Sequence, residues 1–101
     1  MRAIVFFDLP TLTSEDLREY RKFRQFLLKN GFIMMQESVY SKLVLSGNSS
    51  DLLTQKINNN LPKNGLVQLL VVTEKQFAGI KYLKGKHQSK VIDSDSRLII
   101  M

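Results

Sequence analysis

Two segments of this chain are too apolar to leave either of their faces in water. Residues 3–7 (Ala-Ile-Val-Phe-Phe) are a continuous apolar run, and Pro10 follows it closely, which favours a buried strand over a helix. Residues 66–73 form a second such run, which only Gln68 interrupts. Successive side chains of a strand point to opposite faces of the sheet, so both strands are apolar on both faces. The chain is therefore expected to form a sheet that is covered on both sides.

The segments around these runs alternate between helical and extended patterns. A helix is expected to begin at a capping box formed by Thr13 and Asp16 and to end before Gly31. Residues 47–50 (Gly-Asn-Ser-Ser) are expected to break the pattern before a second, less amphipathic helix. The expected strands and helices are, in order, residues 3–7, 14–30, 32–36, 39–45, 51–60 and 66–73.

This order of strand, helix, strand, strand, helix, strand predicts an α+β protein with the ferredoxin-like split βαβ arrangement. The core domain is expected over residues 1–74. Residues 75–101 are expected to form a C-terminal extension that contains a basic loop and a short terminal strand at residues 97–101. That strand could pair with the sheet of its own chain or of a partner.

Both helices of this fold pack on one face of the sheet, so the apolar second face needs another cover. The same face of a second copy would provide it, which predicts a sheet-on-sheet homodimer. The alternative is that residues 74–101 fold back over their own sheet, although they contain few apolar residues.

Composition limits the kinds of site and partner that the chain can have. The 101 residues include no cysteine and one histidine, His87, which excludes disulfides and thiolate sites and leaves almost no material for a histidine triad or a zinc site. No apolar run is long enough to span a bilayer, so a cytoplasmic protein is expected. Fifteen Lys and Arg against nine Asp and Glu give a net charge of +6, which favours a polyanionic partner such as nucleic acid.

Five short motifs resemble the Cas2 family of CRISPR-associated proteins, over essentially the whole chain. In order, they are Asp8-Leu9-Pro10, Tyr20-Arg21-Lys22-Phe23-Arg24, Gly31-Phe32 with Gln36-Glu37-Ser38-Val39-Tyr40, Thr73-Glu74-Lys75-Gln76-Phe77 and Asp95-Ser96-Arg97-Leu98. The last two motifs look like the branch found beside Cas9 effectors in type II systems. The resemblance implies a ferredoxin-like homodimer that bridges Cas1 integrase dimers and binds duplex DNA during spacer acquisition. Many members of the family are described as magnesium-dependent endonucleases acting on RNA or double-stranded DNA.

Asp8 is the candidate catalytic and metal-binding residue, because the resemblance places the family's metal-binding aspartate at this position. Magnesium takes oxygen ligands, and one or two carboxylates with waters and phosphate are usual. One aspartate per chain is few, but the twofold axis of a homodimer could bring two copies of Asp8 together. The structural alternative is an Asx turn before Pro10.

Two basic segments are candidate phosphate contacts, and a solvated surface is the alternative for each. In the first helix the cations are Arg18, Arg21, Lys22, Arg24 and Lys29. In the basic run at residues 81–90 they include Lys81, Lys84 and Lys86. Ser38 and Tyr40 match the family's motif, but packing and corner geometry explain them better than catalysis does, because Ser38 has no histidine partner.

Three functions are consistent with these residues. The first is a basic dimeric scaffold that spaces two integrase dimers and holds a duplex without cleaving it. The second is a metal-dependent endonuclease, either in the same system or as a toxin-like ribonuclease. The third is an unrelated ferredoxin-like RNA-binding module, which the lack of an RNP motif argues against. The single carboxylate and the lack of a convincing general base favour the scaffold.

Overall fold

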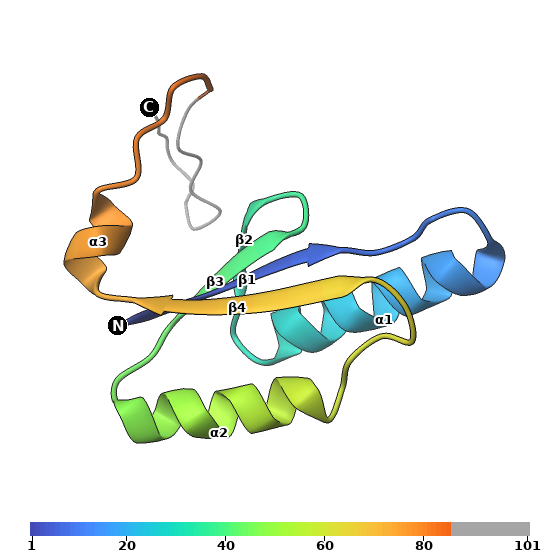
Figure 1. Cartoon of the computed structure of the whole chain (residues 1–101), viewed down its shortest axis with the longest axis horizontal. Helices are drawn as coiled ribbons and strands as arrows, with labels where there is room; N and C mark the ends of the chain where they lie inside the picture. Colours follow the sequence, from blue (N-terminus) through green and yellow to red (C-terminus); the bar gives the residue numbers. More distant parts are fainter. Residues whose placement is uncertain (86–101) are drawn as a thin grey trace.

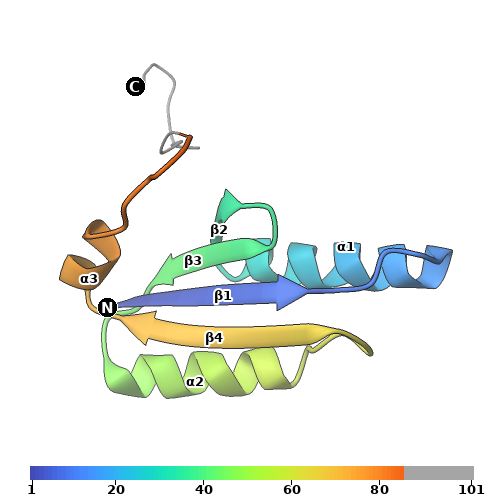
Figure 2. The same cartoon turned by 45° about the horizontal axis from the view of Figure 1, so that its top comes forward.

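The computed structural model describes residues 1–85, in which a four-stranded antiparallel sheet carries two long helices on one face (Figure 1). The elements are β1 (Arg2–Asp8), α1 (Ser14–Lys29), β2 (Ile33–Gln36), β3 (Val39–Leu43), α2 (Gly47–Asn58), β4 (Leu66–Val72) and α3 (Glu74–Ala78). The strand order is β2-β3-β1-β4, with β1 between β3 and β4 (Figure 2). This order confirms the predicted ferredoxin-like fold.

The core lies between the sheet and the two long helices. Ala3, Val5 and Phe7 alternate along β1 and are buried on the helix side, as the period of a strand requires. The ring of Phe7 is central, because it stacks on Tyr40 of β3 and meets Phe23 of α1 edge to face. The other buried residues of the helices are Leu27, Leu53 and Ile57.

Both ends of α1 follow the sequence prediction. The side chain of Thr13 accepts a hydrogen bond from the backbone N–H of Asp16, whose carboxylate accepts one from Thr13 N–H in return. After the helix, Gly31 adopts a left-handed φ of 88°. The ammonium group of Lys42, on β3, donates a hydrogen bond of 2.5 Å to the carbonyl oxygen of Asn30. A cation from the sheet therefore satisfies the C-terminal end of α1.

Replacing Lys42 with Met is expected to lower the free energy of unfolding by about 1–2 kcal/mol, because the substitution keeps the half-buried stem and removes a charged hydrogen bond. Lys29→Met is the matched control, since Lys29 is exposed in the same last turn and should change stability by less than about 0.5 kcal/mol. Urea unfolding of both variants measures the difference. Equal effects would show that the Lys42 bond contributes nothing specific.

The second helix corrects the sequence prediction at its start. It begins at Gly47 rather than at residue 51, because the side chain of Ser46 caps it by accepting a hydrogen bond from Ser49 N–H. The small polar residues expected to break the pattern form its first turn. Leu52 is 60% exposed, and the buried residues of α2 are Leu53 and Ile57.

Two apolar residues near the ends of elements are exposed. Leu17, in the first turn of α1, is 41% exposed. Strand β3 ends at Leu43, and Leu45 is 88% exposed in the connection to α2.

No helix was expected at the position of α3. Thr73 caps it, and a capping box between Thr73 and Gln76 is the signal that could have revealed it. Glu74 holds the helix against the start of β1 through two hydrogen bonds from the Arg2 guanidinium, of 2.7 and 3.1 Å. These bonds lower the pKa of Glu74. The same guanidinium lies 4.4 Å from the ring centre of Phe77.

The face of the sheet that points away from α1 and α2 is largely apolar, and neither of these long helices covers it (Figures 1 and 2). Within residues 1–85, α3 contacts its Arg2 end through Glu74 and Phe77. Strand register places Ile4 and Phe6 of β1 on this outer face, opposite residues of β3 and β4. Its other apolar members are Ile33, Val39, Leu43, Leu66, Leu70 and Val72. Leu66 is 55% exposed and Leu70 is 51% exposed. The two-sided apolar character predicted for the sheet is thus present, whereas the expected strand at residues 97–101 lies outside the described residues.

Candidate functional site

Asp8 is the last residue of β1 and stands on the outer face. It lies opposite Leu66 of β4, and its side chain is exposed. Its carboxylate makes no hydrogen bond or ion pair with any residue from 1 to 85, so it does not form the side-chain hydrogen bond of an Asx turn there. A free carboxylate at a sheet end is able to accept bonds from a cation or its bound waters.

The corner between β2 and β3 supports the end of β1 through its backbone. Ser38 adopts a φ of 68°, and its carbonyl oxygen accepts a hydrogen bond of 3.0 Å from Phe7 N–H. No histidine lies among residues 1–85, and His87 falls outside them, so the corner interpretation of Ser38 is supported. Tyr40 is 1% exposed and points to the helix side of the sheet, away from Asp8. The core-filling interpretation of Tyr40 is therefore confirmed.

Residues 1–85 of one chain do not supply a closed metal site. Within residues 1–85 there is no group of three or more acidic or histidine side chains that could hold a metal ion. Magnesium tolerates such a sparse donor set where waters and substrate phosphate complete its shell. The single carboxylate of Asp8 therefore fits a site shared with a second chain and a substrate, and not a preformed cage.

Two acidic side chains of α1, Glu15 and Glu19, contact Lys63 in the loop between α2 and β4. The ammonium group of Lys63 lies 3.0 Å from a carboxylate oxygen of Glu15, and its backbone N–H donates a hydrogen bond of 3.2 Å to Glu19. The bond to Glu15 raises the pKa of Lys63, with smaller contributions from the Glu15 and Glu19 charges. This loop thus partly neutralises the acids that interrupt the basic sequence of the helix.

The basic side chains of α1 are exposed and unpaired within the described part of the chain. We call these five residues the α1 strip: Arg18, Arg21, Lys22, Arg24 and Lys29. At 100° per residue, Arg18 and Arg21 lie on the side of α1 opposite its buried residues, Phe23 and Leu27. The strip is able to contact phosphates without first breaking an ion pair.

The structure does not bring Lys81 and Lys84, the described lysines of the second basic segment, to the α1 strip. Lys81 and Lys84 are exposed beyond α3, at the end of the sheet where β1 begins, whereas α1 begins at the other end (Figures 1 and 2). Lys86 lies outside the described residues. These lysines remain candidates for a separate phosphate contact.

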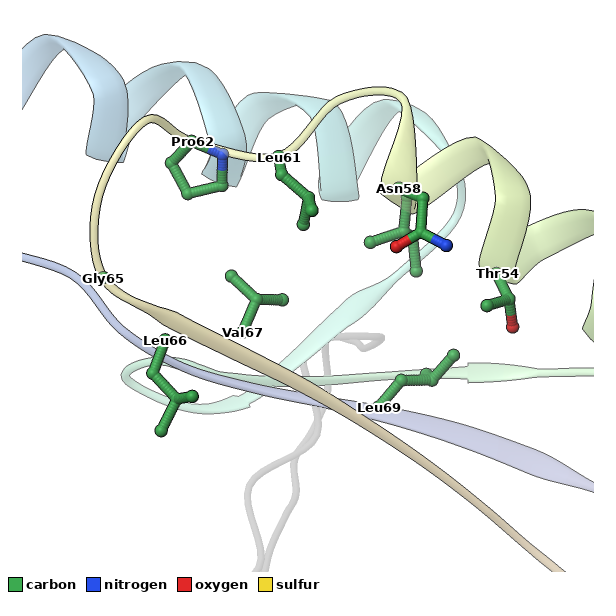
Figure 3. Close-up of a pocket in the computed structure, with 9 residues that line it drawn as sticks. Thr54, Asn58, Leu61, Pro62, Gly65, Leu66, Val67 and Leu69 are labelled. Carbon is green, nitrogen blue, oxygen red and sulfur yellow. The ribbon is translucent and has the colours of Figure 1, made fainter.

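A hollow of about 310 Å³ lies between α2 and β4 (Figure 3). Its lining includes Ile57, Leu61 and Leu69 but no charged side chain. It therefore does not suit a phosphate or a metal ion.

No helix among residues 1–85 is long and apolar enough to cross a membrane.

Comparison with known proteins assigns the chain to a family. The model of the family described as CRISPR associated protein Cas2 matches residues 1–80. A CRISPR-associated endoribonuclease Cas2 of Streptococcus mutans serotype c (strain ATCC 700610 / UA159) is 50% identical over 101 residues, which cover all of this chain and 93% of the relative. A protein of the same description from Treponema denticola is 46% identical over the full length of both chains.

A solved structure, Streptococcus pyogenes Cas2 at pH 6.5, has the same fold. The two superpose with a TM-score of 0.63 at 16% sequence identity, over 83% of this chain and all of the other. With the matched family model and relatives of up to 50% identity over the whole sequence, the chain belongs to the Cas2 family of CRISPR-associated proteins.

Proposed function

We propose that this protein is a CRISPR adaptation protein that works as a homodimer, bridges Cas1 integrase dimers and binds duplex DNA during spacer acquisition. Family membership removes the unrelated RNA-binding module from the three alternatives. The observation that carries the proposal is the separation of two surfaces. The outer face of the sheet is largely apolar, whereas the α1 strip on the helix layer is basic and makes no ion pair within residues 1–85. Placement in the type II branch stays a prediction.

The outer face supports the homodimer. Half-exposed leucines such as Leu66 and Leu70 would leave water if the outer faces of two copies met. Burial of apolar surface is worth roughly 25 cal/mol per Å², so several such side chains from each chain favour association. Asp8 lies at the end of the same face and would occur twice in that dimer.

The α1 strip supports duplex binding. Cations that contact phosphates release counterions from DNA, which gives sequence-independent binding that weakens with salt. A protein that holds many different spacers needs affinity of this kind, because it must not depend on base sequence. Arg18 and Arg21 are the strongest candidates, since both point directly away from the core.

Replacing Arg18 and Arg21 together with Gln is expected to weaken duplex binding about tenfold or more and to reduce the slope of log affinity against log salt by about 1 per lost contact in each chain. Fluorescence anisotropy with a labelled duplex over a salt series measures both quantities. Lys56→Gln with Lys75→Gln is the matched control, because it removes the same charge from exposed positions on α2 and α3. Equal losses in the two double variants would show that net charge matters and the α1 strip does not.

A second candidate function is metal-dependent cleavage of nucleic acid, which the free carboxylate of Asp8 favours. Relatives of this chain are described as endoribonucleases. Asp8 would hold the ion, and a bound magnesium ion polarises a phosphodiester and supplies an activated water. The protein's own contribution would be to place the carboxylate where two chains and the substrate meet.

A further inference from the structure

Gly65 lies unusually close to the backbone of Asp8. It adopts a φ of 103° where the loop after α2 turns into β4, beside the end of β1 (Figure 3). A Cβ atom on Gly65 would lie 2.7 Å from the carbonyl oxygen of Asp8 and 2.7 Å from Cδ2 of Leu9. Real Cβ atoms do not approach a backbone oxygen so closely, so any other residue at position 65 would displace the Asp8–Leu9 peptide.

The remaining contacts leave little freedom to absorb such a displacement elsewhere. Leu66, the next residue, pairs with Asp8 in the register of β1 and β4. On the other side of β1, Phe7 N–H is held by the carbonyl oxygen of Ser38. The side chain of Leu9 is buried beneath this junction. The backbone around Asp8 is therefore held by Leu66 on one side and, through Phe7, by Ser38 on the other, although the Asp8 side chain makes no bond within residues 1–85.

We propose that Gly65 is the positioning residue for Asp8: the bare Cα at position 65 fixes the Asp8 peptide, and thereby where the carboxylate stands on the outer face. The proposal rests on the metal-binding role of Asp8 proposed above. In a site shared by two chains, a shift of the peptide would be repeated in the second copy, so the distance between the two carboxylates would change by up to twice the shift of either one. Gly65 is thus expected to control metal affinity without contacting the metal.

Gly65→Ala is expected to weaken Mn²⁺ binding by the full chain about tenfold, the size of effect seen when the support of a metal ligand is lost. Titration calorimetry measures the affinity, and paramagnetic broadening of the Asp8 carboxylate signal in carbon NMR locates the ion. The Asp8 carbonyl carbon signal should also move in Gly65→Ala without metal. Gly31→Ala is the matched control, since φ is 88° there but the added Cβ would stand 3.5 Å from the flexible Lys42 side chain. It should retain wild-type Mn²⁺ binding at a smaller cost in stability, because both variants strain a positive φ but only Gly65→Ala also meets a backbone atom.

The outcomes separate the two proposals. If Asp8→Asn binds Mn²⁺ as the wild type does, the metal role fails whatever Gly65 does. If Asp8→Asn loses binding while folded Gly65→Ala keeps wild-type affinity and an unmoved Asp8 carbonyl signal, the role of Gly65 is overturned. If Gly65→Ala does not fold, the double variant Leu9→Ala/Gly65→Ala is compared with the single variant Leu9→Ala, both in a stabilising osmolyte. The double variant lacks the clash with the Leu9 side chain and keeps the clash with the Asp8 carbonyl oxygen.

Discussion

Leu70→Glu is expected to convert the protein from a dimer into a monomer. Leu70 stands near the middle of the outer face, opposite Ile4 of β1, and is half exposed in the single chain. A glutamate there reaches water in the monomer, so the chain should still fold. In the proposed dimer the same carboxylate would be buried without a partner, which typically costs several kcal/mol per charge and weakens association more than about a hundredfold.

Leu52→Glu is the control for this change. Leu52 is exposed to a similar extent, 60% against 51% for Leu70, but it lies on α2 and not on the outer face. Sedimentation equilibrium across a range of concentrations should give twice the chain mass for the wild type and for Leu52→Glu, and the mass of one chain for Leu70→Glu. A wild-type protein that sediments as a monomer would refute the proposed dimer outright.

Asp8→Asn is expected to reduce magnesium-dependent cleavage more than about a hundredfold, because loss of even the groups that support a metal ligand costs 10–100-fold. Asparagine has nearly the same shape and keeps one oxygen, but it lacks the charge that holds a hard cation. The carboxylate makes no bond within residues 1–85, so the substitution should leave stability almost unchanged. Cleavage of labelled RNA and of duplex DNA, with and without magnesium, measures the effect.

The same variant separates the two candidate functions when spacer integration is assayed with the cognate Cas1 protein. Lost cleavage with intact integration would assign cleavage to Asp8 and leave the scaffold role independent of it. Asp51→Asn, an exposed acid on α2, controls for the change in charge. Cleavage that survives Asp8→Asn undiminished would eliminate Asp8 as the metal ligand.

Local pattern was enough to predict the fold, because the strongest signals in this chain are local. The apolar run that ends at Phe7 fixed the central strand, and the Thr13 and Asp16 pair fixed the start of α1. The apolar outer face was also predicted, because odd-numbered and even-numbered residues of β1 are both apolar and must therefore lie on opposite faces of the sheet. The end of the buried strand placed Asp8 at the rim of the sheet, and the resemblance to the Cas2 family made it the candidate metal ligand.

Other features depend on contacts between distant parts of the chain. The pairing of Lys63 with Glu15 joins residues 48 positions apart, so sequence alone did not reveal how the acids of α1 are partly neutralised. The sequence around Gly65 does not show that its Cα approaches the Asp8 backbone, which is why a glycine is needed there. The start of α2 was misplaced because Ser46 caps a turn whose residues have low helix propensity.

Because Asp8 lies on the outer face, the proposed cleavage would depend on the concentration of the chain. If two chains each contribute one carboxylate, the competent site exists only in the paired state, and the number of such sites grows with the square of chain concentration wherever dimers are the minority. Cleavage per chain would then fall in proportion to dilution, with no inhibitor and no change in shape. A cell that keeps the protein scarce would hold the nuclease inactive by mass action alone.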